Sequence, residues 1–246
     1  MEDKTILITG GTGKVGTVLV NYYADKGYNV VFTSRSLLNI EKLKGKRSNV
    51  YGIQADFSQS NAVDDIISWL VESKLDVNYL INNARNIDAL KVGDDGFISP
   101  ENWIMEYQID VVTPYLLSVG LSRKMSLKKI VNISSMYGVN AYNPTLYEGI
   151  HRFPLQYACA KASLIHLTRC LAVFFADSGI SVNCISLGGI SGRADRAFQE
   201  RYAKLCPQRR MMKEEEVIGS VDFLISDESV YITGENIKVD GGWGIW

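Results

Sequence analysis

The sequence has 246 residues, of which 46% are hydrophobic and 22% are charged, and its formal net charge is -1. These values are those of an ordinary soluble globular chain, long enough for one large α/β domain or two small ones. The small net charge excludes the strongly basic surface by which many proteins hold nucleic acid, and the apolar run near the N-terminus is too short to cross a membrane or act as a secretion signal.

Short apolar runs alternate with amphipathic segments of helical length along the chain. The predicted strands are residues 4–9, 28–34, 49–56, 77–84, 128–135, 180–188 and 235–242. The predicted helices are residues 15–27, 62–74, 100–118 with a break near Pro114, and 154–179. This alternation predicts βαβ units, and strands rich in Ile, Val and Leu predict a sheet covered on both faces. We therefore expect one α/β domain over residues 1–246, with a Rossmann-type, doubly wound parallel sheet.

Four cysteines stand at positions 159, 170, 184 and 206, without CxxC spacing or a zinc-binding pattern. We interpret them as reduced thiols and expect a cytoplasmic protein with no metal site.

A glycine-rich turn joins the first predicted strand to the first predicted helix. Gly10, Gly13 and Gly16 give it the spacing GxxGxxG. Such a turn lets the backbone approach a pyrophosphate, which binds at the helix N-terminus, although a turn without any ligand is the structural alternative. The P-loop pattern GxxxxGK[ST] is absent, so an NTPase is not indicated. The residues of the turn that we predict to contact a dinucleotide are Gly10, Thr12, Gly13, Lys14, Val15 and Gly16.

The end of the second predicted strand bears on the choice between NAD and NADP. A carboxylate there would bond the ribose 2′-hydroxyl of NAD, but this chain has Ser34 followed by Arg35. An arginine can pair with the 2′-phosphate of NADP, and Lys14 is expected to add a positive charge near the same pocket. We predict that NADP(H) is preferred and that NAD(H) is the alternative cofactor. A solvated Arg35 at a strand end is the structural alternative.

Polar residues at the ends of the next two strands extend this predicted cofactor site. Asp56 ends the third predicted strand, where a carboxylate can accept from an adenine amino group or a backbone amide, and Phe57 follows it. Asn83 and Ala84 end the fourth predicted strand, at the edge of the sheet where ligands bind. We predict that these four residues contact the cofactor, whereas Asn82 is at least as well explained by bracing neighbouring strands.

A hydroxyl, a phenol and an ammonium group are expected to meet at the same edge. Ser134 and Ser135 end the fifth predicted strand, and the next helix carries Tyr157 and Lys161 four residues apart, hence on one face. A free phenol has a pKa of about 10, and a nearby ammonium group favours the phenolate. Ser135 can hydrogen-bond the substrate oxygen while Tyr157 moves the proton and a nicotinamide moves the hydride.

The sequence resembles the short-chain dehydrogenase/reductase family over essentially its whole length. The matching motifs, in the family's order, are TGGTGKVG, INNA, IVNISS, YACAK, VNCISLGGI and ITGENIKVDGG. The resemblance implies Tyr157 as the catalytic acid/base, Lys161 as the residue that favours its ionisation and holds the nicotinamide ribose, and Ser135 as the oxyanion partner. It also implies cofactor contacts at Gly188 and Ile190, and a homodimer or homotetramer.

Several positions depart from the family's usual pattern. The glycine spacing is that of the family's extended branch, whereas the length and the C-terminal VDGG suit the shorter branch. Arg85 stands where the NNAG motif has its last glycine. Asp110 stands where most members have an asparagine that helps a water-linked proton relay. A carboxylate there can orient water, which makes Asp110 a candidate catalytic residue, or it can cap the helix break before Pro114.

The stretch between Ser135 and Tyr157 is longer than in typical members. Its conspicuous residues are Tyr137, Tyr142, Tyr147, Glu148, His151 and Arg152. An insertion beside the active edge is suited to substrate selection, although a surface loop packed on itself is equally compatible with the sequence. The insertion and the Arg85-Asn86 pair are also similar, more loosely, to dehydrogenases of bacterial flagellin and surface-glycan modification, which serve nonulosonate or nucleotide-sugar pathways. Arg85 and Arg152 are then candidate phosphate or carboxylate contacts.

The leading prediction is an NADP(H)-preferring oxidoreductase of a secondary alcohol or ketone. Its partner would be a small molecule, such as a sugar or nucleotide-sugar of carbohydrate biosynthesis, and not nucleic acid or a membrane. Two alternatives use the same fold. One is a cofactor-binding sensor without turnover, and the other is a sugar epimerase or dehydratase with retained cofactor, which the GxxGxxG spacing favours.

Overall fold

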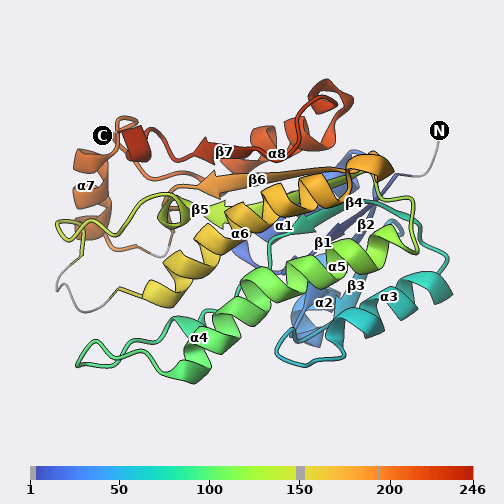
Figure 1. The fold of residues 1–246 in the computed structure, drawn as a ribbon, viewed down its shortest axis with the longest axis horizontal. Coiled ribbons are helices and arrows are strands. Elements are labelled where there is room, and N and C mark those ends of the chain that lie inside the picture. The colour runs from blue at the N-terminus through green and yellow to red at the C-terminus, as the bar shows by residue number, and fades with distance from the viewer. Residues whose placement is uncertain (1–3, 148–152, 193, 246) are drawn as a thin grey trace.

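The computed structural model describes residues 4–147, 153–192 and 194–245. Within these residues one parallel sheet has the strand order β3-β2-β1-β4-β5-β6-β7 (Figure 1). Its strands are β1 (Thr5–Ile8), β2 (Asn29–Ser34), β3 (Val50–Gln54), β4 (Val77–Asn82), β5 (Lys129–Ser135), β6 (Ser181–Leu187) and β7 (Asn236–Val239). The strand order reverses at β1 and β4, which is where ligands bind in open α/β sheets.

Helices cover both faces of this sheet, as the alternating sequence pattern predicts. They are α1 (Lys14–Asp25), α2 (Leu37–Lys44), α3 (Ala62–Glu72), α4 (Pro100–Tyr107), α5 (Thr113–Ser122), α6 (Leu155–Phe174), α7 (Arg196–Leu205) and α8 (Ile218–Ile225). One apolar core includes side chains of α1, α2 and α8, and the other includes side chains of α3, α5 and α6. Within β1, Ile6 and Ile8 enter the first core and Leu7 the second, because successive strand residues point to opposite faces. The predicted Rossmann-type fold is confirmed.

The long helix predicted from residue 100 is divided by a π-helical segment, η2 (Gln108–Val112), which ends two residues before Pro114. Proline has no N–H to continue the helical ladder, so the preceding turn widens. The hydroxyl of Thr113 donates a hydrogen bond to the carbonyl of Gln108, at 2.8 Å, across this turn. The predicted break is therefore a widened turn, and it carries Asp110.

Helices α7 and α8 lie outside the predicted helix ranges, and so does α2. Ser36 caps its N-terminus by accepting from the backbone N–H of Asn39, and Gly45 ends it with a positive φ of 57°. Ile40 is the helix's one buried residue, so the apolar periodicity that would reveal a helix is weak.

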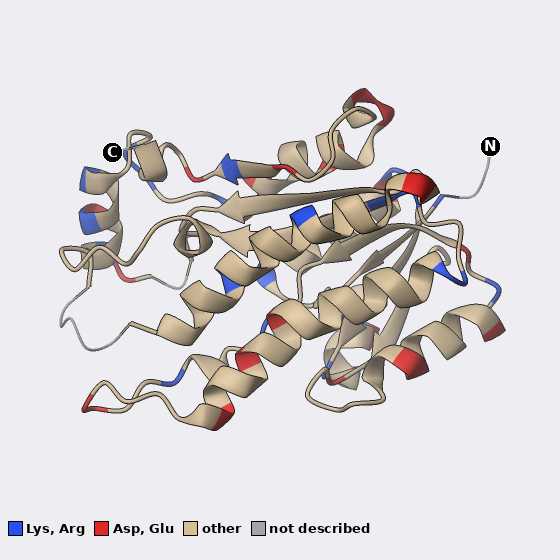
Figure 2. Cartoon of the chain, in the orientation of Figure 1, with Lys and Arg blue, Asp and Glu red and all other residues tan. Residues whose placement is uncertain are grey.

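Charges of both signs are spread over the molecule in Figure 2, in keeping with its small net charge. In the part of the chain that the structure describes, no helix is long and apolar enough to cross a membrane. The four cysteines are free thiols, and Cys184 and Cys206 are buried.

Candidate active site

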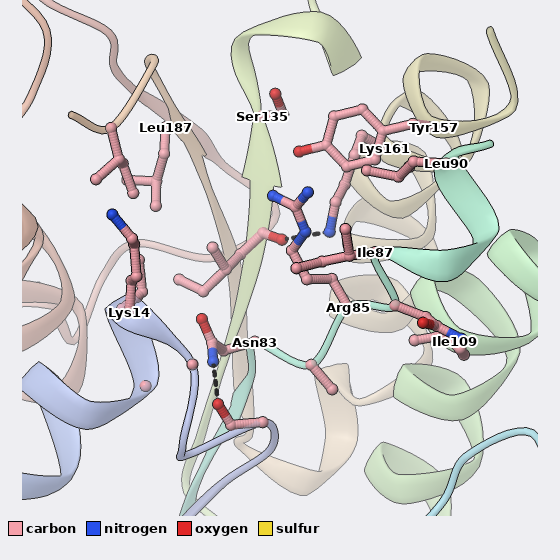
Figure 3. Close-up of a pocket in the computed structure, with 18 of the residues that line it drawn as sticks. Lys14, Asn83, Arg85, Ile87, Leu90, Ile109, Ser135, Tyr157, Lys161 and Leu187 are labelled. Carbon is pink, nitrogen blue, oxygen red and sulfur yellow. Dashed lines mark hydrogen bonds between the residues drawn. The ribbon is translucent and has the colours of Figure 1, made fainter. Parts of the chain in front are cut away.

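A cavity of about 850 Å³ follows the carboxyl edge of the sheet from the N-terminal end of α2 to the first turn of α6. A volume of this size is typical of sites for small molecules and cofactors. Its lining contains every candidate cofactor residue and the candidate catalytic residues Ser135, Tyr157 and Lys161, some of which Figure 3 shows. Asp110 is outside the lining and lies against Lys161. The structure therefore brings the predicted site residues together around one cavity, and Asp110 lies behind Lys161.

The glycine turn packs so closely against neighbouring backbone that side chains would not fit at two of its positions. A Cβ on Gly10 would lie 2.8 Å from the Cα of Ala84, and a Cβ on Gly16 would lie 2.3 Å from the carbonyl oxygen of Gly10. Gly10 also has a positive φ of 66°. Gly13 is the N-cap of α1 and supplies no side chain to cap it. The first N–H groups of α1 are thus free to bind an anion at the positive end of the helix, which fits the pyrophosphate of a dinucleotide.

The far end of the cavity holds the residues that bear on the choice of cofactor. The hydroxyls of Ser34 and Thr12 are hydrogen-bonded at 2.7 Å, and Ser34 also accepts from the backbone N–H of Ser36 at 3.2 Å. The guanidinium group of Arg35 is exposed and lies 3.5 Å from the carboxylate of Asp88. The end of β2 therefore carries a hydroxyl that is already bonded and a guanidinium group in a loose surface pair.

The expected position of Lys14 needs correction. Its ammonium group lies 3.0 Å from the carboxylate of Glu214 and donates to the carbonyl of Ser191, also at 3.0 Å. Figure 3 shows Lys14 directed toward Leu187. Its charge is therefore paired on the β6 side of the cavity and does not add to that of Arg35. The glycine turn fixes the backbone of Lys14, but its long side chain can reach toward either β2 or β6. The carboxylate of Glu214 holds it on the β6 side.

Residues at the end of β4 hold the glycine turn in place. The side-chain amide of Asn83 donates to the carbonyls of Thr9 and Gly10, at 2.9 and 3.2 Å, and the backbone N–H of Ala84 donates to the hydroxyl of Thr9. Asn82 donates to Asn132 of β5 at 2.8 Å, which is the bracing role that the sequence suggested. At the end of the third strand, the carboxylate of Asp56 accepts from the backbone N–H of Ser58.

Ser135, Tyr157 and Lys161 come together at the opposite end of the cavity (Figure 3). Ser135 ends β5, and its hydroxyl accepts from the backbone N–H of Tyr137 at 3.2 Å. On α6, the ammonium group of Lys161 lies 5.7 Å from the ring centroid of Tyr157, so both side chains share the face that their spacing predicted. The ammonium group donates to the carbonyl of Ile133 at 3.0 Å, which fixes Lys161 against β5.

A buried ion pair lies behind the candidate catalytic residues. The ammonium group of Lys161 is 3.0 Å from the carboxylate of Asp110, and these residues are 4% and 2% exposed. Burial alone would lower the pKa of Lys161, but Asp110 and Tyr157 raise it above its usual value. The ammonium group is therefore charged at neutral pH. The Asp110 carboxylate thus pairs directly with Lys161, and among the described residues it makes no hydrogen bond that would cap the helix break.

Glu106 is a buried acid near this pair that sequence reasoning missed. It stands one helical turn before Asp110 and is 1% exposed, and neither of its carboxyl oxygens has a hydrogen-bond partner among the described residues. Burial, assisted by the charge of Asp110, raises the pKa of Glu106 to about 8. The carboxyl group is then largely protonated at neutral pH. The only signal in the sequence is an acid four residues before Asp110, and such a residue ordinarily lies on a solvated helix face.

Replacing Glu106 with glutamine should flatten the dependence of stability on pH. Between about pH 4.5 and 8 the folded protein keeps a proton on Glu106 that the unfolded chain has released, so the free energy of unfolding falls as the pH rises. Glutamine removes this dependence. Relative to wild type, we expect Glu106→Gln to gain stability from pH 5 to pH 8, measured by urea unfolding. The control Glu101→Gln, on the exposed part of α4, should show no such gain, and parallel curves for wild type and Glu106→Gln would contradict the assignment.

The long insertion forms an aromatic cluster beside Tyr157. Tyr137, Tyr142 and Tyr147 line the cavity, and the rings of Tyr137 and Tyr142 lie 4.1 Å apart. Tyr142 stacks on Phe153 at 4.9 Å, and the hydroxyls of Tyr137 and Tyr147 are hydrogen-bonded to each other. Burial raises the pKa of all three phenols, which keeps them neutral at working pH. The residues Glu148, His151 and Arg152 of the insertion lie outside the described residues.

The fold and this arrangement define a nicotinamide-dependent oxidoreductase of alcohols and ketones. A family profile described as enoyl-(acyl carrier protein) reductase matches residues 14–244. The chain belongs to the short-chain dehydrogenase/reductase family, as its motifs predict.

The names of individual relatives indicate different functions. The chain is 29% identical to a 3-oxoacyl-[acyl-carrier-protein] reductase of Buchnera aphidicola, over 98% of both chains. It is 27% identical to post-translational flagellin modification protein A of Campylobacter coli, over the whole of both chains. The structure of a short-chain dehydrogenase of Leptospira borgpetersenii with bound NAD⁺ is 31% identical, with a TM-score of 0.87 over 99% of this chain and 93% of that one. These similarities show the family and not the substrate.

Proposed function

We propose that the protein transfers a hydride between NADP(H) and a secondary alcohol or ketone of a sugar or nucleotide-sugar. The convergence of Ser135, Tyr157 and Lys161 in the cavity that also contains the glycine turn carries this proposal. Assays that follow the consumption of NADPH with simple ketones, sugars and nucleotide-sugars test it. Failure of every carbonyl compound to oxidise NADPH or NADH, despite cofactor binding, would contradict turnover and favour the cofactor-sensing alternative.

In the proposed mechanism Ser135 and Tyr157 act on the substrate oxygen, and Lys161 acts on Tyr157. When bound, the cofactor supplies the hydride in reduction and accepts it in oxidation. Ser135 and Tyr157 hold the substrate oxygen, and Tyr157 gives it a proton in reduction. Lys161 is held by Ile133 and Asp110 and keeps its charge beside the phenol ring, where it would hold the ribose of a bound cofactor. Because Asp110 pairs with Lys161 behind the cavity, the geometry supports a role in which Asp110 orients the Lys161 side chain.

The proposed sugar substrate rests on the insertion. Its three tyrosines line the cavity beside Tyr157, so a substrate held there would contact their rings and hydroxyls. The full-length similarity to a flagellin modification protein agrees with the looser resemblance to flagellin-modification dehydrogenases on which the sugar proposal draws. The retained-cofactor epimerase gains no further support, because the glycine spacing alone suggests it.

The proposed preference for NADP(H) rests on Arg35. Ser34 provides no carboxylate to bind a ribose 2′-hydroxyl or to repel a 2′-phosphate. The pair between Arg35 and Asp88 is exposed and contributes little stability, so a phosphate can take the place of Asp88. The NAD⁺ bound to the Leptospira relative makes a direct test necessary.

We expect Arg35→Ala to weaken NADPH binding about tenfold or more, because it removes a charge-assisted hydrogen bond to the phosphate. NADH binding should change less than about threefold. Cofactor fluorescence titrations of wild type and variant measure both constants. Asp88→Asn is the matched control and should strengthen NADPH binding by freeing Arg35. Equal losses for the two cofactors, or a wild type that prefers NADH, would contradict the proposal.

We also propose a cytoplasmic homodimer or homotetramer. The four free thiols agree with a reducing compartment. Large apolar side chains exposed on α4, α5 and α6 agree with an interface between subunits, and they include Ile104, Tyr115, Leu116, Val173 and Phe174.

A further inference from the structure

Arg85 reaches into the substrate end of the cavity. It follows Ala84 beyond the end of β4, and its guanidinium carbon lies 5.5 Å from the ring centroid of Tyr157. Figure 3 shows its side chain directed toward Tyr157 and Lys161. Arg85 also lines the cavity itself. A guanidinium group is therefore placed next to the residue that is proposed to hold the reacting oxygen.

The other cations of the cavity are neutralised by carboxylates. Lys14 pairs with Glu214 at 3.0 Å, Arg35 with Asp88 at 3.5 Å, and Lys161 with Asp110 at 3.0 Å. Arg85 has no carboxylate within ion-pair distance among the described residues. Its positive charge is thus the one in the described lining that has no carboxylate partner.

The acids near Arg85 do not supply its counter-ion. Asp110 is paired with Lys161, and Glu106, with its pKa raised to about 8, is largely protonated at neutral pH. Asp56 is the one carboxylate in the described lining and lies beyond the end of β3, where it accepts from the backbone of Ser58. Among the described residues, the substrate end of the cavity therefore has a net positive charge that suits an anion.

A carboxylate fits this position best. A guanidinium group is a planar fork that binds a carboxylate through two parallel hydrogen bonds. Arg85 and the reacting oxygen would share Tyr157 as a neighbour, so only a few bonds can separate the anionic group from the reacting carbon. The uncapped N-terminus of α1 is the proposed place of the cofactor pyrophosphate.

We propose that Arg85 binds a carboxylate of the substrate, so that the substrate is a hydroxy or oxo acid, acidic sugars included. This inference rests on the proposed hydride transfer and narrows its substrate class. An acid bound in this way has its carbonyl oxygen at Ser135 and Tyr157 and its carboxylate at Arg85. Two fixed points orient the carbon to which the hydride is delivered.

The test compares acids with matched neutral compounds. Wild type, Arg85→Gln and Arg85→Lys are assayed with 2-oxo, 3-oxo and sugar acids and with the amide of each. For the best acid, we expect wild type to favour the acid over its amide by about 10- to 150-fold in kcat/KM, which is the range for a charge-assisted hydrogen bond. Arg85→Gln should lose most of this preference, chiefly through KM, and Arg85→Lys should keep part of it. The Kd of NADPH should change less than about twofold in both variants.

Several results would overturn the assignment. One is that wild type uses acids and amides equally well. Another is that Arg85→Gln loses activity equally with acids and amides, which would mean that Arg85 acts on Tyr157. A third is that the variant binds NADPH more weakly, which would mean that Arg85 holds a cofactor phosphate. A preference for phosphorylated sugars that depends on Arg85 would replace the carboxylate by a phosphate. If wild type reduces neutral ketones alone, the proposed hydride transfer stands and this inference fails.

A binding assay keeps the two proposals separable if wild type turns over no compound. Isothermal titration of the cofactor-loaded protein with malonate should then show saturable binding that Arg85→Gln loses. Binding without turnover would sink the proposed function and retain the anion site, whereas no difference between wild type and variant would overturn the site as well.

Discussion

Replacing Tyr157 with phenylalanine should reduce turnover about a thousandfold or more and leave cofactor affinity nearly unchanged. The variant loses the proton donor, which contributes about 10²- to 10⁴-fold in general acid catalysis, and one of the two hydrogen bonds to the substrate oxygen. The phenylalanine ring can keep the place between Arg85 and Lys161, 5.5 and 5.7 Å from the ring centroid, so the surrounding structure should persist. Single-turnover reduction of the best carbonyl compound, with NADPH already bound, measures the loss directly.

Tyr142→Phe is the matched control, because it removes another cavity-lining hydroxyl near the same site. That hydroxyl donates to the carbonyl of Pro154 at 3.2 Å, and burial keeps the phenol neutral. We expect a loss below about tenfold, of the size of one ordinary hydrogen bond. If Tyr157→Phe kept a tenth of the wild-type rate, or if Tyr142→Phe were equally damaging, Tyr157 would not be the proton donor.

The parts of this site that the sequence predicted are those set by short-range geometry and by sheet topology. A spacing of four puts Tyr157 and Lys161 on one helix face, and the parallel sheet brings the ends of β1, β4 and β5 to one edge. The glycine turn was also predictable, because a turn between a strand and a helix directs its backbone N–H groups toward the helix N-terminus.

The parts that the sequence did not predict depend on where long or charged side chains find partners. Lys14 turns toward Glu214, which is distant in the sequence and comes near only because the segment before α8 returns to the glycine turn. Glu106 stands on a helix whose other acid, Glu101, is exposed, so nothing local marks it as buried. The pairing of Asp110 with Lys161 requires η2 to pack on α6, which residue spacing within one helix cannot show.

Replacing Lys161 with methionine should both abolish turnover and destabilise the fold. Methionine has a similar length but no charge, so Asp110 is left as a buried carboxylate without its counter-ion. Breaking a buried ion pair from one side costs about 3–5 kcal/mol, because the remaining charge keeps its full desolvation penalty. Lys161 also loses its hydrogen bond to the carbonyl of Ile133. Urea unfolding at pH 7 should show a lower midpoint with an unchanged slope.

The double variant Lys161→Met/Asp110→Asn separates the structural role of the pair from the catalytic role of the ammonium group. Removing the second charge should restore most of the lost stability, because replacing both members of a buried pair by neutral groups is often nearly neutral. Turnover should stay absent, since the phenol of Tyr157 still lacks the cation that lies 5.7 Å from its ring. If the single variant were as stable as wild type, the buried pair would not exist in solution. If the double variant regained activity, Lys161 would serve only to neutralise Asp110.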